Sequence, residues 1–130
     1  MYKRQVDADF TLVGTEPDRV PVILFHGTAD PIVPYAGGDT RMLGRTRGMV
    51  RSARDTAEAY APATTPTTSS DGAVERVDWG AVRLVTQIGA GHVVPNRTTS
   101  PARAFVGPSH HDLDAGEELG AFFGLLPATA

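Results

Sequence analysis

Cysteine is absent from this 130-residue chain, and that absence rules out disulfides, thiolate nucleophiles and cysteine–zinc sites. It leaves the cellular compartment open. No apolar run comes near the roughly 20 residues that a membrane-spanning helix needs. The opening stretch MYKRQVDADF contains basic residues but no apolar segment after them, so it lacks the pattern of a secretory signal. The sequence therefore assigns no localisation.

An excess of charge of one sign is also missing. The chain has 12 Lys and Arg against 15 Asp and Glu, a net charge of −3 and a pI near 5.7. This balance gives no electrostatic reason to expect a nucleic acid or a membrane as a partner. The length and the 41% hydrophobic content are instead typical of a globular domain that buries a core.

What is present is a series of short apolar segments. The continuous run Val20–Phe25 predicts a strand buried on both faces, as in a parallel sheet. Val74–Trp79 and Val82–Ile88 also have strand-like patterns. Residues 37–50 are rich in glycine and arginine and are expected to form a loop or a poor helix. The Pro/Thr/Ser-rich stretch Pro62–Gly72 is expected to be an exposed loop.

Two helices are expected. Ser52–Ala61 begins with a serine that can cap the helix and is followed by Pro62, which ends it. A second helix starts after Asp114, and four of its apolar residues at i, i+3, i+4 and i+7 should face a core: Leu119, Phe122, Phe123 and Leu126. Strands alternating with helices predict an α/β architecture with a mostly parallel sheet.

Two loops leave the predicted strands at their carboxyl ends, where functional groups collect in sheets of this type. HGTADPIVP follows the first strand and holds Asp30, whereas GAGHVVP follows the last and holds His92. An aspartate bonded to one imidazole nitrogen fixes the tautomer and prepares the other nitrogen to take a proton from a hydroxyl. We therefore predict that Asp30 and His92 are catalytic, and that they lie within about 2.6–3.2 Å of each other.

Several segments together resemble the carboxyl-terminal part of the polyhydroxybutyrate depolymerase/feruloyl esterase family of bacterial α/β-hydrolase serine esterases. They are HGTADPIVPYAGG, SARDTAEAYA, VERVDWG, VRLVTQIGAGH and HHDLDAGEELGAFFG. The resemblance runs from Val20 to Leu126 and implies an α/β-hydrolase fold, of which only the carboxyl-terminal portion is present. It also implies that Asp30 is the triad acid and His92 the triad base. Members of the family are often secreted.

The nucleophile of that family lies in a G-x-S-x-G turn, and no such turn occurs in these 130 residues. The loop after Tyr60 also departs from the family, because APATT replaces an Asn-Gly-Cys stretch. The chain is accordingly expected to be a truncated metagenomic fragment without its nucleophile. Residues 1–19 would form an amino-terminal segment whose first residues are not native, and residues 20–130 the part with the triad acid and histidine.

The expected function is hydrolysis of carboxylic esters by the complete enzyme, with no cofactor and no metal. His110, His111 and Asp112 lack the spacing of a good metal site, and His26 is expected to have a backbone or packing role. The alternative is a non-catalytic small domain that binds a partner through an open sheet edge. If the chain is a fragment, the strands that would lie beside Val20–Phe25 are missing, so self-association through an exposed sheet edge is expected.

Overall fold

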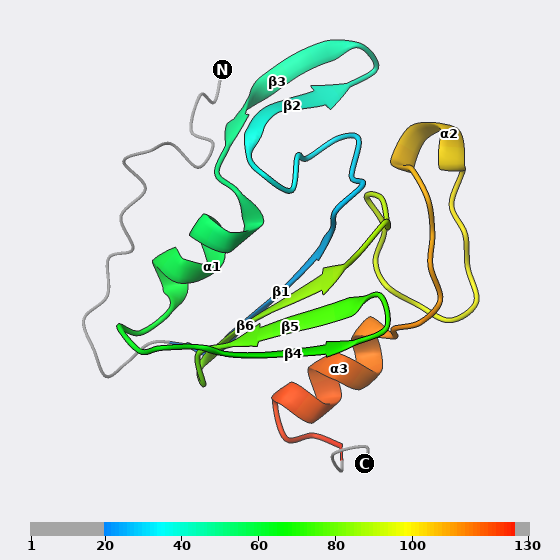
Figure 1. Cartoon of the computed structure of the whole chain (residues 1–130). Helices are drawn as coiled ribbons and strands as arrows, with labels where there is room; N and C mark the ends of the chain where they lie inside the picture. The colour runs from blue at the N-terminus through cyan, green and yellow to red at the C-terminus, as the bar shows by residue number, and fades with distance from the viewer. Residues whose placement is uncertain (1–19, 127–130) are drawn as a thin grey trace.

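The computed structural model describes residues 20–126 as one four-stranded sheet, a separate two-stranded hairpin and three helices (Figure 1). The strands are β1 (Val22–Gly27), β2 (Gly38–Met42), β3 (Arg45–Val50), β4 (Thr67–Asp71), β5 (Val74–Asp78) and β6 (Val82–Gln87). The helices are α1 (Ala53–Tyr60), α2 (Arg103–Val106) and α3 (Ala115–Phe122). No helix within this part of the chain is long and apolar enough to cross a membrane.

The mostly parallel sheet of an α/β-hydrolase portion was a wrong prediction. The order of the main sheet is β1-β6-β5-β4, and only β1 and β6 run parallel. β5 is antiparallel to both β6 and β4. The reason lies in the connections: three residues join β5 to β6 and two join β4 to β5, whereas a parallel pair needs a crossover of about a dozen residues. The fold is a mixed sheet with few helices.

Two segments predicted as loops contain strands. Residues 37–50 include the β2–β3 hairpin, in which Met42 pairs with Arg45 across a two-residue turn. Both turn residues have positive φ, +50° at Leu43 and +74° at Gly44. A type I′ hairpin turn requires that combination. Leucine is unusual at the first position of such a turn. For that reason the amino-acid sequence of residues 37–50 did not indicate a hairpin. The second segment, Pro62–Gly72, contains the exposed edge strand β4.

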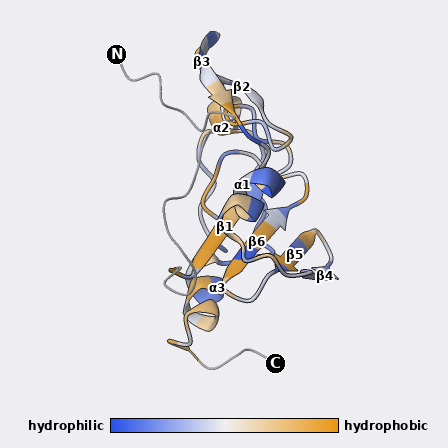
Figure 2. Cartoon of the chain, turned by 90° about the vertical axis from the view of Figure 1, so that its left-hand side faces the viewer, coloured by the Kyte–Doolittle hydropathy of each residue, from blue (hydrophilic) through white to orange (hydrophobic). Residues whose placement is uncertain are grey.

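Helices cover both faces of the sheet (Figures 1 and 2). α1 begins as predicted, because the Ser52 hydroxyl accepts a hydrogen bond from the backbone N–H of Asp55 at 3.0 Å. Its buried face packs on one side of β6 and β5 in a cluster of Ala53, Ala57, Val77, Trp79, Val82 and Leu84. The segment leading into α3 lies on the other side, where Leu113 packs against Val74 and Val85.

α3 is capped by Asp114 as predicted, but its apolar stripe does not face the core as expected. Leu119, Phe123 and Leu126 are exposed, and the buried positions of the helix are Ala115 and Gly120. Gly120 is buried because the side chain of Leu126 folds back over it, and a Cβ on Gly120 would lie 2.5 Å from Leu126 Cδ1. Phe122, the fourth residue of the stripe, is half-buried, and the Arg83 guanidinium lies 5.1 Å from the centre of its ring.

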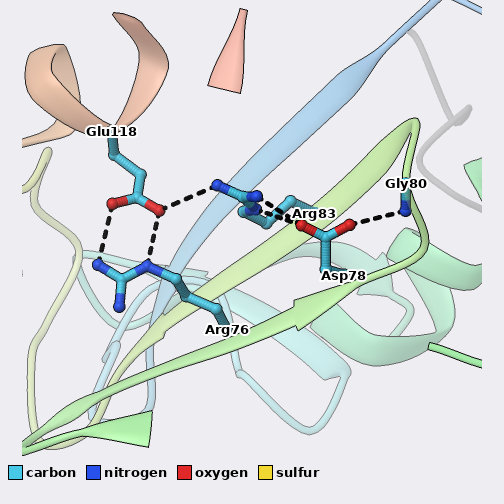
Figure 3. A network of polar contacts seen from close by, with 5 residues as sticks. All are labelled: Arg76, Asp78, Gly80, Arg83 and Glu118. Atoms are coloured by element: carbon cyan, nitrogen blue, oxygen red, sulfur yellow. Dashed lines mark hydrogen bonds and ion pairs between the residues drawn. The ribbon is translucent and has the colours of Figure 1, made fainter. Parts of the chain in front are cut away.

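Ion pairs attach α3 to the sheet (Figure 3). Arg76 of β5 donates two hydrogen bonds to Glu118 of α3, Nε to Oε1 at 2.7 Å and Nη2 to Oε2 at 2.9 Å. Arg83 of β6 reaches the same carboxylate at 3.4 Å and also donates to Asp78. The Glu118 side chain is only 11% exposed. Its hydrogen bonds with Arg76 hold the pKa of this carboxyl below the ordinary value.

Replacing this carboxylate is expected to destabilise the fold in a pH-dependent way. Glu118→Gln should lower the free energy of unfolding by about 1–3 kcal/mol at neutral pH, since it leaves the half-buried Arg76 guanidinium without its carboxylate partner, whereas Arg83 keeps Asp78. Because the folded-state pKa is lowered, the stabilisation is present above the ordinary pKa of 4.5 and is lost as the pH falls below it. Urea unfolding as a function of pH measures both effects. The matched control is Glu117→Gln, whose exposed partner is Arg97; an equal loss in this variant would contradict the prediction.

Candidate active site

The Asp30 carboxylate is fixed by the backbone of its own loop. Its Oδ1 accepts hydrogen bonds from the N–H groups of Ile32 and Val33, both at 2.8 Å. The side chain is only 4% exposed. Two backbone donors on one oxygen fix the orientation of the carboxylate. The second oxygen, Oδ2, is therefore held in position for another donor.

That donor is His92. Its Nδ1 lies 2.8 Å from Asp30 Oδ2, within the distance predicted from the sequence. A carboxylate only accepts, so Nδ1 carries the hydrogen and Nε2 keeps its lone pair when the ring is neutral. Nε2 has no hydrogen-bond partner within residues 20–126. The pair thus has the geometry of an oriented general base, while its participation in a reaction remains a prediction.

The parallel pairing of β1 and β6 brings these two loops together. Gly27 at the end of β1 is in register with Gln87 at the end of β6. Beyond the strands, Thr28 N–H donates to Gln87 O at 3.1 Å and Ala29 N–H donates to Ala90 O at 2.9 Å. A Cβ on Gly27 would lie 2.2 Å from the Ala90 carbonyl oxygen, so only glycine permits this approach.

A third segment, Val106–Pro108 at the end of α2, contacts both loops. The N–H groups of Gly91 and His92 donate to the carbonyls of Pro108 and Val106 at 2.7 and 2.6 Å. On its other side the segment meets the Asp30 loop, since a Cβ on Gly107 would lie 3.1 Å from Pro31 Cδ and 3.2 Å from Ala29 O. The sequence does not indicate this brace of residues 106–108, because a lone glycine in a long loop does not reveal its contacts.

Substitution in the brace is expected to disturb the Asp30–His92 hydrogen bond. Gly107→Ala adds a Cβ against both loops and places alanine at φ +83°. The Nδ1 proton of His92, observed by NMR, should exchange faster or disappear. Gly80→Ala is the matched control, because its φ is +86° and its Cβ would meet nothing within 4 Å. Unchanged His92 signals in the Gly107 variant would show that the brace does not position the pair.

A pocket of about 390 Å³ opens beside the pair. Its lining includes both residues together with Phe25, Val33, Val93, Val94 and Pro95. Most of these side chains are apolar, so the pocket suits an uncharged organic group and not a strongly charged one. The imidazole is 48% exposed and can be reached from solvent.

The remaining histidines have other contacts. His26 lines the same pocket, but its ring meets Tyr35 edge-on at 5.4 Å and its Nδ1 lies 3.0 Å from Gly27 O, in agreement with the expected packing role. His111 contacts Ser100, with Nε2 and Oγ 3.1 Å apart, and Asn96 O at 2.8 Å. This exposed serine–histidine contact was not predicted, since nothing in the spacing indicates it.

No cluster of three or more metal-ligating side chains occurs among residues 20–126. His110, which the sequence placed beside His111 and Asp112, lies against Gly89, and its backbone carbonyl faces Gln87 Nε2 at 3.5 Å. The described chain thus brings together Asp30 and His92 and leaves the other titratable loop residues apart from them.

Comparison of the chain with protein-family models, with curated proteins and with solved structures finds no match.

Proposed function

We propose that Asp30 and His92 are the acid and base of a Ser-His-Asp triad in a carboxylic-ester hydrolase. The observation that carries the proposal is the 2.8 Å contact between His92 Nδ1 and Asp30 Oδ2, in which the aspartate is also held by two backbone donors. An aspartate held in this way selects the tautomer with a basic Nε2. The resemblance of the loop sequences to serine esterases of the polyhydroxybutyrate depolymerase/feruloyl esterase type agrees with this role.

The chemistry of such a pair is defined. His92 Nε2 removes the proton of a serine hydroxyl as its oxygen attacks the ester carbonyl carbon. Asp30 stabilises the imidazolium that forms and does not itself take the proton. The imidazolium then protonates the departing alcohol, which leaves an acyl-serine. In the second half, His92 Nε2 removes a proton from water as the water attacks the acyl carbon, and the imidazolium returns the proton to the serine oxygen as the acid leaves. The apolar pocket beside His92 would hold the acyl or alcohol group of the ester.

The proposal requires a serine nucleophile, and these 130 residues contain no G-x-S-x-G turn. No described serine contacts His92, and Ser100 contacts His111. The test is ester hydrolysis by the protein that results when the reading frame is extended upstream of Met1. A G-x-S-x-G turn in that extension, with turnover of a p-nitrophenyl ester, would support the triad. Turnover by the 130-residue chain alone, or an upstream extension without a nucleophile, would contradict it.

A second candidate function is strand binding at β1, as in a non-catalytic interaction domain. β1 pairs with β6 on one side only, and its other side has no strand partner among the described residues. A row of unpaired backbone groups beside apolar side chains favours addition of a strand from another chain. An upstream stop codon, together with strand addition observed by NMR, would favour this function over catalysis.

A further inference from the structure

The protruding β2–β3 hairpin concentrates positive charge. Arg41, Arg45 and Arg47 are exposed, and none of them has a carboxylate partner in residues 20–126. Asp39 is the one acidic residue in residues 38–50, so the hairpin has three positive charges and one negative charge, a net of +2. The whole chain has a net charge of −3, which leaves −5 for the rest. The overall acidic balance therefore conceals a basic end of the molecule.

Apolar side chains are exposed at the same end. Met42 is 48% exposed and Leu43 79% exposed, and both lie at the hairpin turn directly between Arg41 and Arg45. Across a groove of about 610 Å³, Phe105 of α2 is 64% exposed. Figure 1 shows α2 beside this turn, and Figure 2 shows hydrophilic residues at the protruding end of the hairpin.

The backbone conformation of Leu43 in the turn is sterically unfavourable for leucine. Its φ of +50° is the only positive φ of a non-glycine residue among the described residues, and leucine pays a steric penalty there that glycine or asparagine would avoid. A soluble surface gains nothing from a strained, exposed leucine. An apolar phase would gain from it, because it could receive Leu43, Met42 and Phe105 together.

From this combination we propose that the hairpin end docks on an anionic lipid surface. The three apolar side chains enter the boundary between headgroups and acyl chains, and the three guanidinium groups lie at the level of the phosphates. Because the arginines are positively charged, the hairpin end should bind an anionic bilayer in preference to a neutral one. The −5 on the rest of the chain is repelled by the same surface and therefore favours the orientation with the hairpin toward the lipid.

The proposal is independent of ester hydrolysis, and its test measures binding alone. The chain is mixed with vesicles of phosphatidylcholine with or without phosphatidylglycerol and floated on a density gradient, in which protein aggregates sink. We expect the protein to float with the anionic vesicles at low salt, and to float little with the neutral ones. High salt should reduce the bound fraction, since it screens the arginines.

Two variants separate the contributions. Arg41→Gln/Arg45→Gln/Arg47→Gln should weaken partitioning by about fivefold for each arginine, or roughly 100-fold together. Met42→Ser/Leu43→Ser should weaken partitioning onto anionic vesicles, and the salt dependence of the partitioning should stay unchanged. Leu125→Ser is the matched control, because Leu125 is equally exposed at 78% and lies outside the hairpin, after α3. No flotation of the parent chain, equal flotation with neutral vesicles, or an equal loss in the control would overturn the proposal.

Discussion

His92→Ala, introduced into the proposed serine esterase, is expected to lower kcat by about 10⁴–10⁶-fold. Without the imidazole, nothing removes the proton of the serine or returns it to the leaving alcohol. Asp30→Asn should cost about 10⁴-fold, because the amide can donate to His92 Nδ1 and so favours the wrong tautomer. KM should change much less than kcat in both variants, since neither residue is the main apolar wall of the pocket. Steady-state kinetics on a p-nitrophenyl ester measure both constants.

The control for this result is His111→Ala. His111 is also an exposed loop histidine with a hydroxyl at one nitrogen and a carbonyl at the other, but it contacts neither Asp30 nor His92. Its removal should leave kcat within about threefold. A double variant of Asp30 and His92 should be no worse than His92→Ala alone, because the two residues act as a unit. Equal losses for His92 and His111, or additive losses for Asp30 and His92, would refute the assignment.

The second large effect concerns association. We propose that the 130-residue chain self-associates through β1 in a concentration-dependent way, visible in sedimentation velocity. The N–H of Val22 donates to Ala81 O, just before β6, and that of Thr28 donates to Gln87 O at the end of β6. In a parallel ladder the N–H groups of Ile23 and Phe25 therefore point away from β6. The side chains of β1 are only partly buried. The net charge of −3 offers little repulsion between copies.

Ile23→Pro tests this proposal by removing one backbone N–H donor of β1. Proline removes an outward-facing donor and puts a ring in the path of an added strand, and edge positions of this kind tolerate it. A symmetric pair of copies would lose two donors, so association should weaken by roughly 30-fold. Leu24→Pro is the contrast, because its N–H faces β6 and its loss should abolish cooperative unfolding. A parent chain that remains monomeric at all concentrations would contradict the proposal.

The positions of the candidate residues were predictable because they depend on local chemistry. The apolar run before Asp30 and the small residues before His92 indicate strands that end in tight turns, and Ser52 and Asp114 cap their helices as expected. The sheet topology was not predictable from the order of elements alone. It depended on the short connections around Gly72 and Gly80, which permit only antiparallel pairing.

The surroundings of the pair could not be predicted for a different reason. Gly107 contacts Pro31 and Gly91 only because segments far apart in the sequence meet in the fold. The β2–β3 turn at Leu43 has no turn-forming residue except Gly44. Long-range packing of this kind leaves no periodicity in the sequence, and a positive φ at leucine opposes the local preference.

The single parallel pair in the sheet also determines when the Asp30–His92 contact can arise during folding. β4, β5 and β6 pair across turns of two and three residues, so this meander can form early and locally. β1 must then find β6 across a chain segment of more than 50 residues, which includes the hairpin and α1. Closing that segment costs conformational entropy before the contacts between β1 and β6 can offset it. We therefore expect the amides of β1 to be protected from hydrogen exchange later than those of β5, and the histidine–aspartate contact to appear only in that last step.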